Sequence, residues 1–141
     1  MQVFVAASYS SQVDYSTGEV LPEYKKWLEN TLAVIEAAGH TVFCALREDQ
    51  YRINNADPAA AFGLDLEHIQ QADALIALLN DKPSAGVQTE IGVAVALQKR
   101  VILAHLTEHE LSYFNAAMLK ARVIAEAALP LKIETLNNLL R

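Results

Sequence analysis

The chain has 141 residues, of which 52% are hydrophobic and 20% are charged, and its formal net charge is −6. This length and composition suit one globular domain with a sheet covered on both faces, and they exclude a disordered chain. The 17 acidic residues outnumber the 11 basic ones, and the basic residues form no stripe, so a nucleic-acid polymer would be repelled.

No apolar run is long enough to cross a bilayer, and the N-terminus lacks the basic and long apolar regions of a signal peptide. The one cysteine, Cys44, lies in an apolar run and cannot form an intramolecular disulfide. We therefore expect a cytoplasmic protein with no membrane partner, in which Cys44 is a buried thiol rather than a nucleophile.

The N-terminal third predicts two strands joined by a loop and a helix. Gln2–Ala7 is apolar and β-rich and predicts a first strand, whereas the polar segment Ser8–Leu21 predicts a long loop. Pro22 begins a helix with apolar residues at helical spacing, and Gly39 ends it. Thr41–Leu46 predicts the second strand.

The next segment, Arg47–Ala56, is polar and irregular. Asp57 and Pro58 are an N-cap and a proline at the first helical position, and they predict a helix towards Gln71. Asp73–Leu79 is nearly all apolar, as expected of a strand that is buried on both faces. A turn is predicted at Asn80–Gly86, followed by a helix from Val87 to Gln98 and a strand at Val101–Leu106. Thr107 and Glu110 form a capping box, which predicts a helix that runs through Glu126. A short last helix is predicted after Pro130.

This alternation of strand and helix is typical of the α/β class. It predicts a flavodoxin- or Rossmann-like, doubly wound parallel sheet of four to five strands, in the order 2-1-3-4, with helices on both faces. No internal repeat or linker divides residues 1–141, so we expect a single domain.

In such a sheet a ligand binds where the strand order reverses, outside the carboxyl ends of strands one and three. Gly86 would let a ligand approach the backbone, and the helix after it offers free N–H groups to an anion. The two loops at this place carry small, hydroxyl-bearing residues: Ser8, Tyr9, Ser10, Ser11 and Ser84.

Two acidic residues are expected near this crevice. Glu90 lies one turn into the helix, where the helix dipole would favour the ionised carboxylate that a nucleophile needs. Asp65 lies on the helix that enters the crevice from strand two, and two converging carboxylates suit acid/base and nucleophilic chemistry. Acidic residues are also common in the first turns of helices and on solvated helix faces, without any functional role.

The pattern D-x-x-x-I-x-x-A-D at Asp65–Asp73, the apolar strand after it and the pattern G-x-x-x-E-I-G at Gly86–Gly92 resemble one known superfamily. It is the nucleoside 2-deoxyribosyltransferase superfamily, which includes 2′-deoxynucleoside 5′-monophosphate N-glycosidases. The segment from Ala94 to Ile102 adds to the similarity, which extends from Gln2 to about Met118.

The resemblance implies cleavage of an N-glycosidic bond. Glu90 matches the nucleophile that attacks C1′ and forms a glycosyl-enzyme, and Asp65 matches the acid/base that assists departure of the base. Asp73 aligns with a family aspartate that we interpret as structural. Water as the second acceptor gives hydrolysis, whereas a second base gives transfer, and two displacements at one carbon retain configuration.

The sequence departs from the family pattern at three positions. Family members often have a tyrosine in the first strand that touches the nucleophile; Phe4 stands here, and Tyr9 could supply a hydroxyl or be an ordinary loop aromatic. Transferases usually have an aspartate six residues before the glutamate, but Ser84 resembles the nucleotide hydrolases, whose serine contacts the 5′-phosphate. A neighbouring subunit in this family lends a polar residue at the position of Ala116, and Asn115 is one residue away.

No cofactor or metal is expected. His105 and His109 straddle a strand end and a helix cap without a third ligand nearby, so we interpret them as a surface pair. No glycine-rich dinucleotide or triphosphate motif is present. Tyr113, Phe114 and Met118 predict a packing face, which the resemblance implies meets a partner subunit in a homodimer or larger homo-oligomer.

The leading hypothesis is therefore an N-glycosidase that acts on a (2′-deoxy)nucleoside 5′-monophosphate, with Glu90 and Asp65 as catalytic residues. One alternative is a nucleoside 2-deoxyribosyltransferase that exchanges bases between deoxynucleosides. A second is a catalytically silent nucleotide-binding or signalling module, which the absence of a tyrosine at Phe4 would allow. The predicted substrate-binding residues are Ser8, Tyr9, Ser10, Ser84, Gly86 and Asn115.

Overall fold

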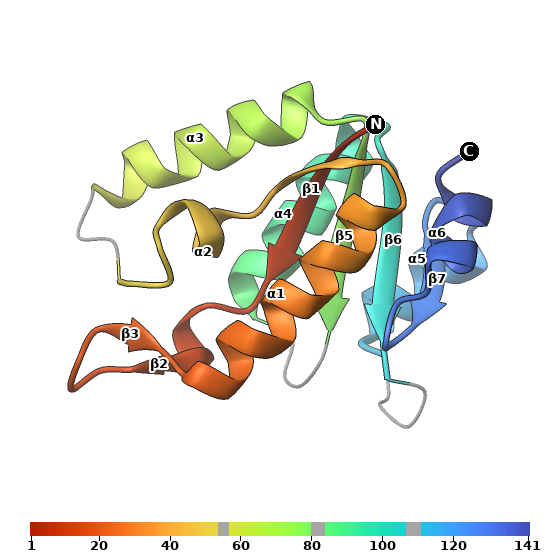
Figure 1. Ribbon diagram of the computed structural model, residues 1–141. Coiled ribbons are helices and arrows are strands. Elements are labelled where there is room, and N and C mark those ends of the chain that lie inside the picture. Colours follow the sequence, from red (N-terminus) through yellow and green to blue (C-terminus); the bar gives the residue numbers. More distant parts are fainter. Residues whose placement is uncertain (54–56, 80–83, 107–110) are drawn as a thin grey trace.

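The apolar runs of the sequence form a parallel sheet in the computed structural model, which describes residues 1–53, 57–79, 84–106 and 111–141 (Figure 1). The order is β4-β1-β5-β6-β7, and every neighbouring pair is parallel. This confirms the predicted α/β class and the predicted order 2-1-3-4, with β7 added as a fifth strand at the edge. The strands are β1 (Gln2–Ala7), β4 (Thr41–Phe43), β5 (Ala74–Leu79), β6 (Arg100–His105) and β7 (Ala125–Ala128).

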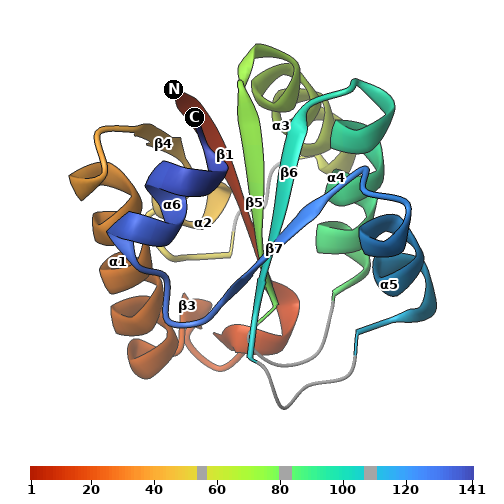
Figure 2. The same ribbon diagram turned by 90° about the vertical axis from the view of Figure 1, so that its right-hand side faces the viewer.

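Helices cover both faces of the sheet, as predicted (Figure 2). One face packs against α1 (Pro22–Ala37) and α6 (Ile133–Leu139), and the other against α3 (Pro58–Gln71), α4 (Ala85–Ala96) and α5 (Tyr113–Lys120). No helix in the described ranges is long and apolar enough to cross a membrane.

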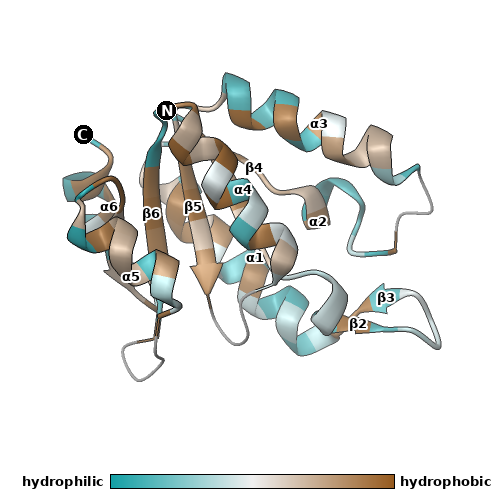
Figure 3. Cartoon of the chain, turned by 180° about the vertical axis from the view of Figure 1, so that it is seen from behind, coloured by the Kyte–Doolittle hydropathy of each residue, from teal (hydrophilic) through white to brown (hydrophobic). Residues whose placement is uncertain are grey.

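The core consists of two apolar clusters that share the sheet. Every residue of β5 is buried, and successive side chains alternate between the clusters: Leu75 packs on the α3–α4 side and Ile76 on the α1 side. Burial on both faces explains why Ala74–Leu79 is a continuous apolar run. In Figure 3, the apolar composition of the central strands appears as the brown colour along most of β5 and β6.

The predicted helix signals are confirmed where the structure describes them. The Asp57 side chain accepts a hydrogen bond from the N–H of Ala59 at 3.1 Å. α4 begins at Ala85 rather than Val87, and Ser84, which was not predicted as a cap, accepts a hydrogen bond from the N–H of Val87 at 3.1 Å. Gly39, just after α1, has a φ of +93°, a conformation that glycine adopts without steric cost.

The predicted loop Ser8–Leu21 contains more structure than its composition indicates. It forms a 3₁₀ helix, η1 (Ser10–Gln12), and a small antiparallel hairpin of β2 (Val13–Asp14) and β3 (Glu19–Val20). The carboxylate of Asp14 accepts hydrogen bonds from the N–H and the hydroxyl of Ser16 in the turn, which is the local bonding that favours turns over strands.

The predicted strand Thr41–Leu46 is too long. β4 ends at Phe43, and the chain enters a short helix, α2 (Ala45–Glu48), whose hydrogen bonds run from the N–H of Glu48 to the Cys44 carbonyl. Leu46 is buried from this helix rather than from a strand. A short apolar run does not by itself distinguish a buried strand from a helical turn.

The predicted helix through Glu126 is wrong. α5 ends at Lys120, and Glu126 lies in β7, where its backbone pairs with Leu103. The alanines of this segment have a high intrinsic helix propensity, but pairing with β6 overrides it. Ser112 caps α5 through a 3.2 Å hydrogen bond from the N–H of Asn115, and the predicted capping box at residues 107 and 110 lies outside the described residues.

Candidate active site

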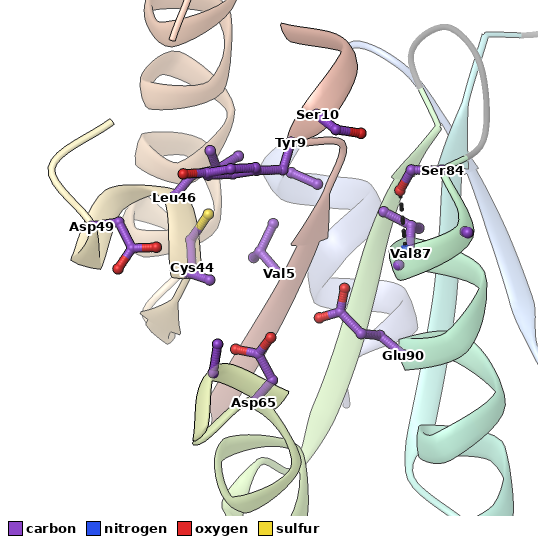
Figure 4. A pocket seen from close by; sticks show the side chains of 15 residues that line it. Val5, Tyr9, Ser10, Cys44, Leu46, Asp49, Asp65, Ser84, Val87 and Glu90 are labelled. Atoms are coloured by element: carbon purple, nitrogen blue, oxygen red, sulfur yellow. Dashed lines mark hydrogen bonds between the residues drawn. The ribbon is translucent and has the colours of Figure 1, made fainter. Parts of the chain in front are cut away.

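The early end of β4 leaves part of β1 without a neighbouring strand on that side. β4 pairs with β1 only at Gln2, Val3 and Phe4, and Val5 and Ala7 instead line a pocket of about 360 Å³. Residues of α2, α3 and the beginning of α4 form the other walls (Figure 4). The pocket therefore lies at the carboxyl half of β1 and beside the helix that follows β5, the region where a ligand crevice was predicted.

Most of the predicted site residues line this pocket. Ser8 does not; it is buried at the end of β1. Asn115 does not line it either, and its amide group is buried and exchanges two 3.0 Å hydrogen bonds with the amide group of Gln88 on α4. This places Asn115 between α4 and α5 of its own chain. The predicted residues that line the pocket are Tyr9, Ser10, Asp65, Ser84, Gly86 and Glu90.

The carboxyl groups of Glu90 and Asp65 point into the same space from different helices, α4 and α3 (Figure 4). Burial, and then the nearby charge of Asp65, raises the pKa of Glu90 to about 8. Burial, and then the charge of Asp49, raises the pKa of Asp65, while His68 acts in the opposite direction. The two groups repel each other when both are ionised, so at neutral pH the pair retains one proton.

The expectation that the helix N-terminus keeps Glu90 ionised is wrong. α4 begins at Ala85 and has no acidic residue in its first turn, and the dipole effect falls off within that turn. Loss of water and the like charge of Asp65 dominate instead.

Neither Phe4 nor Tyr9 places a hydroxyl donor at Glu90. Phe4 is buried against Phe43, with ring centroids 5.4 Å apart, and does not line the pocket. Tyr9 lines the pocket, but its hydroxyl donates a 2.6 Å hydrogen bond to the Arg52 carbonyl. That bond uses the one hydroxyl proton of Tyr9 and fixes its ring as a wall of the pocket.

The beginning of α4 forms one end of the pocket. The hydroxyl of Ser84 accepts from the N–H of Val87 and keeps its own proton to donate. In the described part of the chain, no acceptor is bonded to the N–H groups of Ala85 and Gly86. A Cβ atom at Gly86 would lie 4.0 Å from the Ser84 hydroxyl, so the approach to these donors is open.

One acidic residue of the pocket, Asp49, was not among the predicted site residues; it follows α2 directly. Its position shortly after the second strand could have indicated a place in the pocket, because the carboxyl end of that strand also meets the crevice. Cys44 lines the pocket too, as the expected buried thiol, and burial raises its pKa to about 11, so the thiol stays neutral.

The described lining of the pocket has three carboxyl groups, from Asp49, Asp65 and Glu90, and no lysine, arginine or histidine. Across the described residues, no group of three or more His, Cys, Asp or Glu side chains could hold a metal ion.

The interpretation of His105 as part of a surface pair is wrong. It is buried at the end of β6, and its Nε2 lies 2.8 Å from the Glu126 carboxylate. The predicted second member of the pair, His109, lies outside the described residues.

Comparison with known proteins adds sequence and fold relationships. The model of the nucleoside 2-deoxyribosyltransferase family matches residues 16–132. The fold is similar to that of the CMP N-glycosidase BcmB of Clostridium botulinum, at 24% identity over 99% of this chain and 98% of that one, with a TM-score of 0.67. It is also similar to a 2-deoxyribosyltransferase from the psychrotolerant bacterium Bacillus psychrosaccharolyticus, at 20% identity over 98% and 91%, with a TM-score of 0.70. BlsM shares 20% identity over 99% and 86%, with a TM-score of 0.74. No curated protein matches the chain in sequence.

Proposed function

Because the chain belongs to the nucleoside 2-deoxyribosyltransferase family, we propose that it cleaves the N-glycosidic bond of a (2′-deoxy)nucleoside 5′-monophosphate. Members of this family act on nucleosides or nucleotides as small molecules. The observation that carries the proposal is the convergence of Glu90 and Asp65 on the pocket at the beginning of α4. Water is the proposed acceptor, so the products are the free base and the sugar 5-phosphate.

Glu90 and Asp65 have complementary roles in the proposed reaction. The Glu90 carboxylate attacks C1′, the C1′–N bond breaks with its electron pair going to the base, and Asp65 gives the base a proton. Asp65 then takes a proton from a water molecule, which attacks C1′ and releases Glu90. The two displacements retain the configuration at C1′.

The raised pKa of Glu90 places the retained proton of the pair on Glu90 in the free protein. The reaction needs the opposite arrangement, a protonated Asp65 and an ionised Glu90, so the proposal requires this proton to move to Asp65 when the substrate binds. The positive charge that develops at the sugar in the transition state favours the arrangement in which Glu90 carries the negative charge.

The groups at the beginning of α4 support the proposal that the substrate carries a 5′-phosphate. An anion there would meet the hydroxyl of Ser84, the N–H groups of Ala85 and Gly86 and the positive end of the helix. The aspartate that transferases usually have at this position would repel the phosphate, at about 1–4 kcal/mol for charges near 4 Å apart at the surface.

A second candidate, base exchange between deoxynucleosides, is favoured by one observation. The described lining has three carboxyl groups and no basic side chain, which suits a neutral nucleoside better than a dianionic phosphate. In that reaction a second base, rather than water, attacks C1′ of the glycosyl-enzyme.

The experiment that separates these functions is incubation with a panel of deoxynucleosides and their monophosphates, with and without a free base, followed by chromatography. We expect monophosphates to be cleaved with the higher kcat/KM, and free base to be released without exchange. Equal kcat/KM values would refute the phosphate site, and products that carry the added base would establish transfer. If no substrate is turned over, the chain is a silent module.

We also propose a cytoplasmic homodimer or larger homo-oligomer. Tyr113 and Phe114 are 81% and 72% exposed and contact each other edge to face, with centroids 5.5 Å apart. Two exposed aromatic side chains on one helix end are typical of a surface that a partner covers, and a second copy of the chain is the partner we propose.

A further inference from the structure

A pair of amide side chains joins the beginnings of α4 and α5, which lie on the same face of the sheet (Figure 2). Gln88 and Asn115 exchange two 3.0 Å hydrogen bonds, the only hydrogen bonds between these two helices among the described residues. Asn115 is 1% exposed, and Gln88 is partly buried. Neither residue belongs to the described lining of the pocket, so the reaction proposed above gives the pair no part.

Each member of the pair is also bonded to the cap of its own helix. The backbone N–H of Gln88 donates to the Ser84 carbonyl at 3.1 Å, and the N–H of Asn115 donates to the Ser112 hydroxyl at 3.2 Å. Ser84 lies directly before Ala85 and Gly86, whose N–H groups are the proposed donors to the phosphate. A continuous set of hydrogen bonds therefore runs from α5 through Gln88 to the first turn of α4.

A hydrogen-bonded amide pair fixes the relative position of two helices more tightly than apolar packing does. Stability alone does not require amides at this place, because apolar side chains of the same shape contribute about as much as a buried, bonded polar pair. The amides add direction, since a hydrogen bond weakens steeply as its geometry changes, whereas apolar contact is non-directional. Two bonds of opposite direction hold both the distance and the rotation of α4 relative to α5.

We propose that Gln88 and Asn115 are positioning residues that hold the first turn of α4 where the Ser84 hydroxyl and the free N–H groups meet the 5′-phosphate of the substrate. This inference rests on the proposed function of the same pocket. A displacement of about 1 Å in a group that binds the substrate is enough to cost about 100-fold in rate. A nucleoside has no phosphate to lose, and Glu90 is adjacent to Ile91, which is fully buried in the core. Loss of the pair should therefore affect monophosphates much more than nucleosides.

The test removes the hydrogen bonds and retains the packing. Gln88→Met and Asn115→Leu each replace an amide by an apolar side chain of similar size and leave the other amide unpaired, whereas the double variant leaves no unpaired amide. We expect each single variant to lose stability in urea unfolding and the double variant to recover most of it. The ratio of kcat/KM for a 2′-deoxynucleoside 5′-monophosphate to that for its nucleoside should fall about 10- to 100-fold in all three variants. Gln70→Met, at an exposed glutamine of α3, is the matched control and should change neither quantity.

A merely structural role predicts a different double variant, in which the ratio recovers together with the stability, and that result would overturn the inference. Backbone ¹⁵N relaxation supplies a measurement that needs no turnover: the order parameters of the Ala85 and Gly86 N–H groups should fall in the double variant, and unchanged values would overturn the inference as well.

Failure of the proposed function is visible in the natural sequence alone. Equal kcat/KM values for its monophosphate and nucleoside would refute the phosphate site and the inference with it. If the natural sequence cleaves neither compound, the proposed reaction fails separately, and the preference is measured as the ratio of their calorimetric affinities. A ratio that the double variant retains would overturn the inference, and a ratio that falls in it would support the inference.

Discussion

Replacing Glu90 by glutamine should make the protein more stable and far less active. The amide has nearly the shape of the carboxyl group but carries no negative charge, so it removes both the nucleophile and the repulsion from Asp65. Loss of covalent catalysis should lower kcat by several orders of magnitude.

The expected stabilisation follows from the pKa of Glu90. A rise from 4.5 to about 8 makes the ionised side chain costly in the folded state, by about 3 kcal/mol at pH 7 if the whole shift acts on folding. The side chain is partly exposed, so we expect about 1–3 kcal/mol. Because the folded-state pKa is raised, wild-type protein loses stability as the pH rises from 4.5 through 8. The advantage of the glutamine variant should grow over that range and vanish below it.

Urea unfolding followed by circular dichroism at pH 4, 6 and 8 measures this difference, alongside chromatographic turnover of nucleoside monophosphates. Glu48→Gln, on the exposed side of α2, is the matched control and should change neither stability nor turnover appreciably. A difference in stability that is independent of pH would show that Glu90 has no raised pKa. Turnover that equals the wild-type value would refute its role as nucleophile.

Three further changes test other parts of the site. Ser84→Asp should narrow or reverse the preference for monophosphates over nucleosides, measured as a ratio of kcat/KM values, because an aspartate would repel the phosphate. Asp65→Asn should lower the pKa of Glu90, because it removes the neighbouring negative charge. Carboxyl ¹³C NMR titration measures this pKa, and an unchanged value would show that the two groups do not interact. Serine at both Tyr113 and Phe114 should shift the oligomer towards monomer in analytical ultracentrifugation, and a wild-type protein that is monomeric and fully active at micromolar concentration would contradict the proposed assembly.

The sheet could be predicted from the sequence because its strands are buried on both faces. Ala74–Leu79 is short, continuously apolar and bounded by polar residues, which is typical of a central strand that is buried on both faces. The first two residues of β7, Ala125 and Glu126, were predicted to be helical because this alanine-rich segment carries no pattern that distinguishes a small edge strand from a helix. Its conformation depends on pairing with β6, a contact that is distant in sequence.

The charged state of Glu90 could not be predicted in the same way. The position of the residue in the helix was visible in the sequence, and it favoured an ionised group. What decides the pKa is the loss of water in the pocket and the approach of Asp65 from α3, and both exist only after α3 and α4 pack together. Sequence spacing indicates which residues converge, whereas desolvation depends on how closely the walls around them meet.

The pocket itself depends on the short length of β4. Had the second strand continued to Leu46 as predicted, it would have paired with β1 beyond Phe4 and covered the edge that now lines the pocket. The turn into α2 moves the chain away from β1, and the same turn brings Asp49 to the pocket wall. The error in the predicted strand and the failure to find Asp49 therefore have one physical cause. Both arise where the backbone leaves the sheet, and that departure both opens the pocket and adds a third carboxyl group to its wall.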